Sequence, residues 1–470
     1  MNLSRLFPSV LAALLACGSQ AFAAPTDGVW EGKLQGAIRL RIHLKSEGGV
    51  RLAKLDSPDQ GTLGLDVELR HLSEDSLSVW LASANGGWSG RISEDGSTLT
   101  GTWSQGGAAI PLTLTRLEAA PDDRKPQEPH PPYPYDVADV SFENAAASVT
   151  LAGTLTSPRG ASKAPAAVLV SGSGPQDRDS HLLGHKPFKL LADQLTRAGI
   201  AVLRYDERGI GKSSGHFRAA TTADFAADAA AAVAYLRTRS DIDGARIVVI
   251  GHSEGGLIAP WVAARDPKLA AIVSLAGPSI RGDALLEAQS IALMRAAGRD
   301  SAGQANTMEF NRKAWQYAFE DTPEDTLKAR VARASLVFVA SLPESERGQV
   351  GDAEQFARTT ATQLADPWFR SFVRLDPGPD LARVRVPMLA YFAERDLQVP
   401  PDSNIPALHA HFKGPRANLL TVHRWPKLNH LFQTATTGLP AEYSLIPETM
   451  APAMLDGLVA WLQTTMGIKR

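Results

Sequence analysis

A serine between small residues carries the strongest chemical signal in this sequence. The pentapeptide Gly251-His-Ser-Glu-Gly255 follows an apolar run at 246–250, and apolar residues recur at helical spacing over 257–262. Glycines at the flanking positions let a chain turn sharply from strand to helix, which lifts the serine hydroxyl above the sheet. The order of strand, tight turn and helix therefore predicts that Ser253 attacks acyl groups.

A serine hydroxyl is a weak nucleophile that needs a general base, and the base needs a carboxylate to orient it. Asp396 lies in the loop after a predicted strand at 387–393, and His430 lies after a predicted strand at 418–424. They follow Ser253 in the order serine, acid, histidine. We predict Asp396 as the acid and His430 as the base.

Other titratable residues near these positions are placed less well. Glu394 abuts its strand, and Asp402 lies beyond two prolines. His252 cannot easily reach the hydroxyl of its neighbour, so we expect it to pack or to bond a nearby loop. Structural roles are also expected for the histidines in or beside a strand or in a helix-like surface stretch, which are His423, His409 and His411.

The oxyanion formed by attack on an acyl group needs two fixed N–H donors. We expect one from the backbone of Glu254, directly after the nucleophile. The other should come from the loop Ser-Gly-Ser-Gly-Pro-Gln-Asp-Arg-Asp at 171–179. Ser173 and Gly174 are the candidates there, because Pro175 has no N–H. A turn kept rich in glycine for its geometry alone is the alternative.

The composition is that of an ordinary globular protein. Among 470 residues, 44% are apolar and 21% are charged, and the formal net charge is -2. This hydrophobicity excludes a disordered chain, and the charge gives no support for a nucleic acid partner. The length allows two or three domains with a large core.

The first 23 residues have the pattern of a secretory signal peptide. Arg5 is followed by an apolar run at 6–16 that is too short to span a membrane, and 21–23 read Ala-Phe-Ala. We expect cleavage there, which predicts a periplasmic or secreted protein. Cys17, the only cysteine in the sequence, stands in a context similar to a bacterial lipoprotein box, so a lipid anchor is the alternative. Under ordinary cleavage no thiol remains for a disulfide or for catalysis.

Residues 24–118 form the first predicted domain. Apolar and polar residues alternate there with period two, which predicts about eight short strands in a small, lipocalin-like antiparallel barrel or sandwich. Trp30, Trp88 and Trp103 either line a ligand cavity or fill the core. A proline-rich linker follows at 119–137.

From 138 to 470 strands and helices alternate, which predicts an α/β domain with a mostly parallel sheet flanked by helices. Thr222 is expected to cap one helix. Only helical stretches occur at about 281–384, which predicts a lid inserted after a central strand, or a helical decoration without substrate contact. The strands are expected near 148–157, 166–172, 200–205, 246–252, 271–276, 387–393 and 418–424.

Several segments together resemble the α/β hydrolase superfamily, and more narrowly the EstD-type bacterial carboxylesterases, over roughly 140–470. The resemblance implies an α/β hydrolase fold with Ser253, Asp396 and His430 as nucleophile, acid and base. It also implies hydrolysis of short acyl esters without a metal or an organic cofactor. The segments that carry it are the loop at 171–179, the serine turn at 251–255, Asp-Pro-Trp-Phe-Arg at 366–370, Asp-Leu-Gln-Val-Pro at 396–400 and Asn-His-Leu-Phe at 429–432.

The leading hypothesis is a serine carboxylesterase that acts on small short-chain esters through an acyl-enzyme. A serine peptidase of the prolyl-oligopeptidase type is an alternative, although four propeller blades need roughly 160 residues, more than precede the linker. The same three residues also serve thioesterases and acyltransferases. A ligand-binding protein on an inactive hydrolase scaffold is the non-enzyme alternative. The residues indicate no oligomeric state.

Overall fold

The chain folds into two compact units, Met1–Asp122 and Asp123–Arg470. The computed structural model describes residues 27–36, 38–60, 62–119, 124–160 and 162–468. The predicted signal peptide at 1–23 and Cys17 lie outside these residues. Within the described ranges, no helix is long and apolar enough to cross a membrane.

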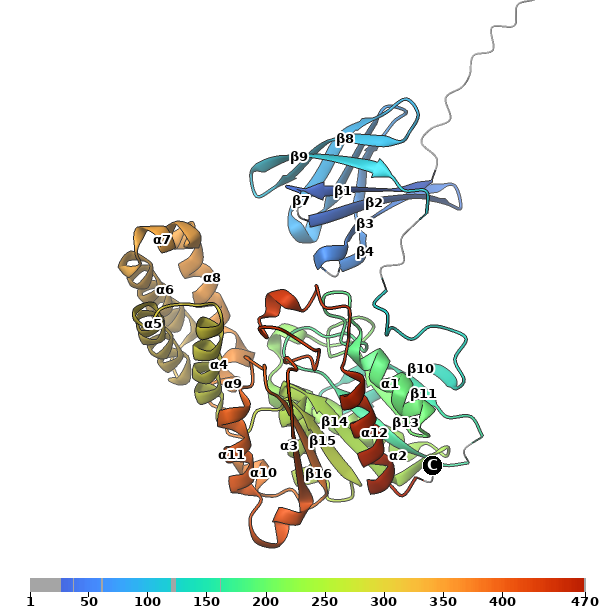
Figure 1. Ribbon diagram of the computed structural model, residues 1–470, viewed down its shortest axis with the longest axis vertical. Helices are drawn as coiled ribbons and strands as arrows, with labels where there is room; N and C mark the ends of the chain where they lie inside the picture. The colour runs from blue at the N-terminus through green and yellow to red at the C-terminus, as the bar shows by residue number, and fades with distance from the viewer. Residues whose placement is uncertain (1–26, 37, 61, 120–123, 161, 469–470) are drawn as a thin grey trace, which may run out of the picture. The chain divides into compact units, whose positions relative to one another are not determined.

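The first unit is a nine-stranded antiparallel sheet in the order β4-β3-β2-β1-β9-β8-β7-β6-β5 (Figure 1). Its strands alternate with period two, so that Leu40, Ile42 and Leu44 of β2 all face the core. The sequence predicted about eight strands, and this sheet has nine. The elements are β1 (Gly28–Leu34), β2 (Ile38–Glu47), β3 (Val50–Ser57), η1 (Pro58–Gln60), β4 (Thr62–Asp66), β5 (Glu68–Leu72), β6 (Ser76–Leu81), η2 (Ala82–Ala84), β7 (Gly86–Ile92), β8 (Thr98–Gln105) and β9 (Ala108–Arg116).

Three tryptophans belong to the interior of the first unit. Trp30, Trp88 and Trp103 are all buried in its apolar cluster. A buried indole needs an acceptor for its N–H. Trp88 Nε1 donates to the carbonyl of Leu112 at 3.0 Å, and Trp30 Nε1 donates to that of Gly96 at 3.0 Å. Of the two roles considered for them, the tryptophans fill the core.

Strands and helices alternate in the second unit (Figure 1). The strands are β10 (Asp136–Asn144), β11 (Val149–Ser157), β12 (Ala164–Val170), β13 (Ala201–Tyr205), β14 (Ile242–His252), β15 (Ala271–Leu275), β16 (Met388–Ala393) and β17 (Leu420–Trp425). The helices are α1 (Pro187–Arg197), η3 (Phe217–Ala219), α2 (Thr222–Thr238), α3 (Glu254–Arg265), α4 (Gly282–Ala296), α5 (Ser301–Phe319), α6 (Glu324–Ser341), α7 (Glu344–Val350), α8 (Ala353–Ala365), α9 (Pro367–Phe372), α10 (Gly378–Leu381), α11 (Pro401–His411), η4 (Gly414–Leu419), η5 (Pro440–Glu442) and α12 (Pro452–Thr465).

The eight strands of the second unit form a mixed sheet in the order β10-β11-β13-β12-β14-β15-β16-β17. β11 is antiparallel to both of its neighbours, and all pairs from β13 to β17 are parallel. Val168 of β12 packs with α2 and α3 on one face, and Leu169 packs with α1 and α12 on the other. Burial on both faces explains the continuous apolar runs that made these strands predictable.

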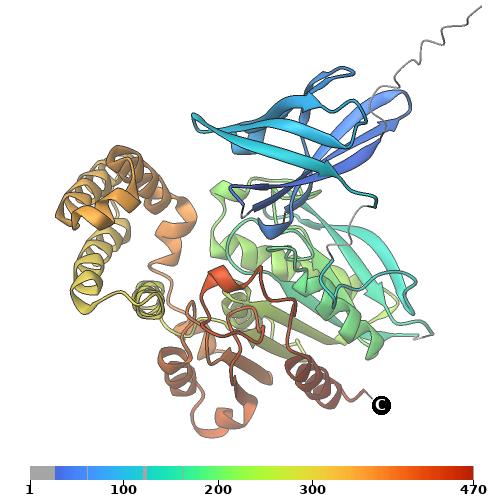
Figure 2. The ribbon, with the colours of Figure 1, turned by 45° about the horizontal axis from the view of Figure 1, so that its top comes forward.

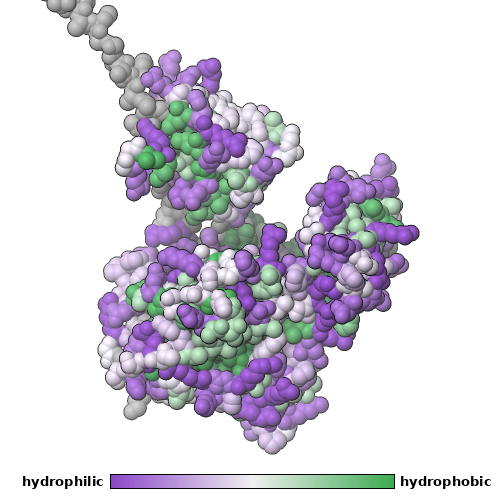
Figure 3. All heavy atoms as spheres, turned by 180° about the vertical axis from the view of Figure 1, so that it is seen from behind, coloured by the Kyte–Doolittle hydropathy of each residue, from purple (hydrophilic) through white to green (hydrophobic). Residues whose placement is uncertain are grey.

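Between β15 and β16 the chain forms the helices α4 to α10. Figure 2 shows most of them, in yellow and orange, as a bundle of their own. The bundle has a small core to which Ala314, Leu327, Val331 and Val373 contribute buried side chains. The face seen in Figure 3 is mainly hydrophilic, as expected for a solvated helical surface.

The structure departs from two local expectations. β10 is an extra strand whose first residues fall within the predicted linker at 119–137, and most of its side chains are exposed, which weakens any hydrophobic pattern. Helix α2 is capped by Thr221 and not by Thr222. The backbone N–H of Thr221 donates to Asp224 Oδ2 at 2.9 Å in a capping box, and Thr222 is free to bond elsewhere.

Candidate active site

Ser253 stands in the turn between β14 and α3 with φ 54° and ψ -118°. A positive φ is uncommon for a residue with a side chain and marks local strain. The N–H of Ser253 donates to the carbonyl of Leu275 at 2.8 Å. A Cβ on Gly251 would lie 1.8 Å from the carbonyl oxygen of Gly255, and a Cβ on Gly255 would lie 2.1 Å from that of Val170. The two glycines are therefore required by the turn itself.

His430 and Asp396 meet in the loops that follow β17 and β16. His430 Nδ1 lies 2.8 Å from Asp396 Oδ2, and the two side chains are 5% and 0% exposed. The backbone N–H groups of Gln398 and Val399 each donate to Asp396 Oδ1 at 2.8 Å, which fixes the carboxylate. Because the carboxylate accepts, Nδ1 carries the hydrogen and Nε2 is left as an acceptor.

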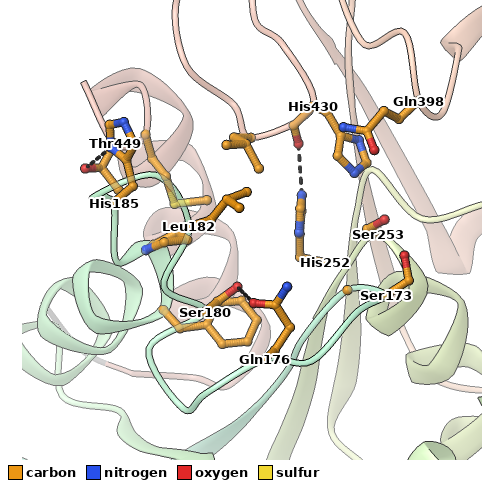
Figure 4. Close-up of a pocket in the computed structure, with 15 residues that line it drawn as sticks. Ser173, Gln176, Ser180, Leu182, His185, His252, Ser253, Gln398, His430 and Thr449 are labelled. Atoms are coloured by element: carbon orange, nitrogen blue, oxygen red, sulfur yellow. Dashed lines mark hydrogen bonds between the residues drawn. The ribbon is translucent and has the colours of Figure 1, made fainter. Parts of the chain in front are cut away.

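Ser253 and His430 line the same cavity. Figure 4 shows the imidazole of His430 pointing toward the side chain of Ser253. In the described part of the chain no hydrogen bond joins the two side chains. Proton transfer from Ser253 Oγ to His430 Nε2 therefore requires the two atoms to approach to about 3 Å. The structure brings the predicted nucleophile, base and acid together.

Two backbone N–H groups near Ser253 are the candidate donors to an oxyanion. Glu254 is the first residue of α3, where an N–H has no intrahelical acceptor. Gly172 and Ser173 line the cavity on the facing loop, and a Cβ on Gly172 would lie 3.0 Å from the Cβ of Ser253. Gly174 is not among the residues that line the cavity. Of the two candidates on this loop, Ser173 is therefore the better placed, and Glu254 stays a candidate because it directly follows Ser253.

The order of the strands and the order of these residues agree with one known arrangement. The sheet has β11 reversed, the serine turn follows β14, the carboxylate follows β16 and the histidine follows β17. In α/β hydrolases the nucleophile, the acid and the histidine follow in this chain order. The second unit is an α/β hydrolase domain. The fold class predicted from the sequence is thereby confirmed.

Comparisons with known proteins agree with this hydrolase domain. A family profile described as serine aminopeptidase, S33, matches residues 186–324. Esterase EstD from Thermotoga maritima is 30% identical over 260 residues, which make up 55% of this chain and 53% of that protein. The chain thus spans about half the length of this curated relative. The resemblance to EstD predicted from the motifs is confirmed at the level of sequence.

Solved structures with a related fold were also found. Esterase Pf2001 from Pyrococcus furiosus is 16% identical with a TM-score of 0.41, and the match covers 71% of this chain and 94% of that chain. The α/β hydrolase GrgF from Penicillium sp. sh18 is 18% identical with a TM-score of 0.46, over 71% and 100% of the two chains. Acetyl xylan esterase from Paenibacillus sp. R4 is 17% identical with a TM-score of 0.41, over 71% and 85%.

His252 holds the backbone of the candidate base in the hydrolase domain. Its Nε2 donates to the carbonyl oxygen of His430 at 2.9 Å, and the centroids of the two rings are 4.8 Å apart. Burial, together with the nearby His430, lowers the pKa of His252 to about 4. The imidazole is therefore neutral near pH 7, and it bonds a neighbouring loop as the sequence predicted.

The cavity of the hydrolase domain has a volume of about 710 Å³ including its open mouth. Its apolar side chains are Leu182, Phe188, Leu431 and Met450, and its polar ones include Gln176, Gln398 and Thr449. Among the residues that the structure describes, no aspartate or glutamate lines it. Across the described ranges of the chain, no group of histidine, cysteine, aspartate and glutamate residues could hold a metal ion.

Two buried glutamates lie behind the loop at 171–179. Glu207 accepts hydrogen bonds from Ser171 Oγ at 2.6 Å and from the backbone N–H of Gln176 at 3.0 Å. Burial raises the pKa of Glu207 to about 8, against the effect of these two bonds. Burial also raises the pKa of the Glu254 carboxyl. Sequence reasoning missed this pair. The available signal is the position of Glu207, two residues after the end of β13.

The inserted helices reach this network through one side chain. Trp368 Nε1 of α9 donates to Glu254 Oε1 at 2.8 Å. The same oxygen accepts from Thr222 Oγ1 at 2.6 Å. The inserted helices therefore contact the side chain of the residue that directly follows Ser253.

Proposed function

We propose that the protein is a serine carboxylesterase that hydrolyses short-chain acyl esters through an acyl-enzyme on Ser253. The observation that carries the proposal is the bond from His430 to Asp396, because it leaves His430 Nε2 as an acceptor on the cavity that Ser253 lines. The similarity to an esterase supports the same reaction.

In the first half of the reaction, Ser253 Oγ attacks the carbonyl carbon of the ester while its proton moves to His430 Nε2. The carbonyl oxygen becomes an oxyanion that accepts from the N–H groups of Glu254 and Ser173. Asp396 stabilises the imidazolium of His430. The imidazolium then gives its proton to the alcohol oxygen as the C–O bond breaks, and the acyl group stays on Ser253.

In the second half, a water molecule takes the place of the alcohol. His430 accepts a proton from the water as its oxygen attacks the acyl carbon. Collapse of the second oxyanion breaks the bond to Ser253 Oγ, which regains its proton from His430. One ester and one water thus give one alcohol and one carboxylic acid.

The lining of the cavity supports short acyl groups. Leu182, Phe188, Leu431 and Met450 offer apolar surface close to Ser253. Each methylene placed against such surface gains about 0.8 kcal/mol until the cavity is full. Longer chains must extend past the cavity and lose this gain.

The test is a panel of p-nitrophenyl acetate, butyrate and octanoate with the full mature chain. We expect kcat/KM for butyrate to exceed that for octanoate by about tenfold or more. Ser253→Ala should lower kcat/KM by about 10³-fold or more, since the nucleophile acts as a unit with the base. Ser253→Ala that keeps more than about a tenth of the wild-type kcat/KM would sink the proposal. Equal rates for all three esters would refute the preference for short acyl groups.

An aminopeptidase is the second candidate function, because the family profile that matches residues 186–324 is described by that activity. An aminopeptidase has to bind the free ammonium of its substrate, and a buried ammonium needs a carboxylate partner. The absence of a carboxylate from the lining residues favours the ester. Aminoacyl and prolyl p-nitroanilides distinguish the two, because kcat/KM values that match those of the esters would support the peptidase.

We further propose that the mature chain begins at Ala24 and acts in the periplasm or outside the cell. The support is the basic, apolar and small-residue pattern of 1–23. The intact mass of the protein from the periplasm of a bacterial host tests it. We expect a chain that starts at Ala24. A lipidated chain that starts at Cys17 would support the anchor instead, and an uncleaved chain would refute both.

A further inference from the structure

The segment 124–128, at the start of the second unit, lies along the loop 443–450. Gln127 joins the two by three hydrogen bonds from its amide. Its Oε1 accepts from the backbone N–H of Thr449 at 2.5 Å and of Met450 at 3.1 Å, and its Nε2 donates to the carbonyl of Met450 at 2.8 Å. The side chain of Gln127 thus bonds to the backbone of this loop in the way that a neighbouring strand would.

Charged side chains fasten the same segment at two further points. Lys125 Nζ donates to the carbonyls of Ser444 at 2.8 Å and Ile446 at 3.3 Å. Glu128, with a side chain 6% exposed, accepts from Lys186 Nζ at 2.8 Å and Lys189 Nζ at 2.7 Å. Bonds to charged groups are stronger than neutral ones. We call residues 125–128 the strap.

The loop that the strap holds forms one wall of the cavity. Thr449 and Met450 both line the cavity beside Ser253, and Figure 4 shows Thr449 bonded to His185. His185 Nδ1 lies 2.9 Å from Thr449 Oγ1, and its Nε2 lies 3.0 Å from the carbonyl oxygen of Tyr443. Two neighbouring backbone N–H groups of this wall therefore depend on a residue more than 300 positions earlier.

The His185 contacts can be made by a neutral ring. The carbonyl of Tyr443 can only accept, so His185 Nε2 donates to it, and Nδ1 then accepts from the hydroxyl of Thr449. Burial, and next the positive charge of Lys125, lower the pKa of His185 to about 4. The ring is therefore neutral near pH 7, which agrees with these two bonds.

The wall is also linked to the loop that bears the candidate base. The backbone N–H of Ala451 donates to the carbonyl of Phe432 at 2.8 Å, two residues after His430. Movement of residues 449–451 would therefore change the shape of the cavity and would also displace the backbone near His430. Asp396 and Ser253 make no bond to the strap, so the catalytic bond from His430 to Asp396 does not depend on it directly.

We propose that the strap determines acyl-chain selectivity by positioning Thr449 and Met450 as a wall of the ester cavity. This inference rests on the proposed function. The strap is a positioning element, because it acts through the wall and touches no reacting atom. It also lies inside the stretch 119–137 that the sequence predicts to be a linker, so this stretch does more than join two domains.

The first test uses amide hydrogen exchange of the full chain and needs no substrate. Gln127→Ala should speed the exchange of Thr449 and Met450 by about tenfold or more, because both N–H groups lose their acceptor. Gln463→Ala is the matched control. Gln463 lies on α12, and its Nε2 also donates to a backbone carbonyl, that of Ala198, at 3.4 Å. Unchanged exchange at Thr449 and Met450 in Gln127→Ala would overturn the positioning role.

The second test is the ratio of kcat/KM for p-nitrophenyl butyrate to that for octanoate. A loosened wall admits longer acyl chains, so Gln127→Ala should lower the ratio by about threefold or more. The change should come from KM, and kcat for acetate should stay within about twofold of wild type. A purely structural role would lower the active fraction and reduce kcat for every ester alike. Gln463→Ala should keep the wild-type ratio.

The outcomes separate the two proposals. Wild-type protein without ester turnover refutes the proposed function, and the exchange measurement still decides whether the strap positions the wall. Normal turnover with an unchanged ratio in Gln127→Ala overturns the selectivity role even when the exchange is faster. Faster exchange together with a lowered ratio supports the inference in full.

Discussion

Glu207→Gln should change how the stability of the protein depends on pH. Glu207 is 6% exposed, and its two oxygens accept from Ser171 Oγ and from the N–H of Gln176. Burial raises the pKa of this carboxyl from 4.5 to about 8. Between these two values the folded chain keeps a proton that the unfolded chain has lost.

The sign and size of the effect follow from this difference. Because the folded state binds more protons between pH 4.5 and about 8, its stability falls as the pH rises through this window. One pKa unit corresponds to about 1.4 kcal/mol, so Glu207 costs the folded state about 3 kcal/mol by pH 7 and about 5 kcal/mol above pH 8. Below pH 4.5 the group is protonated in both states and the cost vanishes.

Glutamine has the shape of the protonated glutamate and the same capacity for hydrogen bonds at this site. Its Oε1 can accept from the N–H of Gln176, and its Nε2 can donate to Ser171 Oγ. In urea unfolding, Glu207→Gln should therefore exceed the wild type by about 1 kcal/mol at pH 5 and by about 3 kcal/mol at pH 7. Glu143→Gln, at an exposed position of β10, is the control and should follow the wild type. Wild-type and Glu207→Gln curves that run parallel from pH 5 to 8 would refute the reasoning.

Other predictions concern the catalytic residues and the glycines around them. Asp396→Asn should lower kcat for p-nitrophenyl butyrate by about 10⁴-fold, since the wrong tautomer of His430 is favoured; steady-state kinetics that stay within tenfold of wild type would contradict this. Gly251→Ala should prevent the native fold, because its Cβ would lie 1.8 Å from a carbonyl oxygen, and a normal thermal transition would count against it. Gly172→Ala should fold yet lose kcat, because its Cβ would lie 3.0 Å from that of Ser253. Unchanged kcat in that variant would show that the nucleophile has room to move.

The catalytic residues could be predicted because their signals are local. The sharp turn at Ser253 needs Gly251 and Gly255 for steric reasons that involve only a few residues. Asp396 follows β16, a buried and continuously apolar strand, and His430 follows β17, a partly exposed strand. The two strands are parallel, so their ends lie at one edge of the sheet. These residues could therefore be predicted although they lie far apart in the sequence.

The surroundings of Glu254 could not be predicted in the same way. Trp368 and Thr222 reach its carboxyl from two separate helices, and a single polar residue on a helix has no periodic signal that names its partner. Two adjacent threonines are equally suited to cap α2. The choice of Thr221 is decided by its capping box with Asp224, which leaves Thr222 for Glu254.

The bonds between the strap and the loop 443–450 could not be predicted from the sequence either. Prolines and a lack of periodicity predict an extended linker at 119–137. The described part of this stretch instead contains turns, such as the one closed by the bond from the Glu128 N–H to the Lys125 carbonyl at 2.8 Å, and it bonds to the rest of the second unit. Gln127 bonds to Thr449 and Met450, and nothing in the composition of either segment reveals the pairing. Long-range bonds between irregular segments have no pattern in sequence.

The central claim is that Ser253 is the nucleophile. A fluorophosphonate probe reacts with activated serines, and mass spectrometry of the labelled peptides locates the adduct. We predict one adduct on Ser253 in the wild-type chain, and neither an adduct nor ester turnover in Ser253→Ala. An adduct on another residue, or a folded wild-type chain that hydrolyses esters without reacting with the probe at Ser253, would contradict the account.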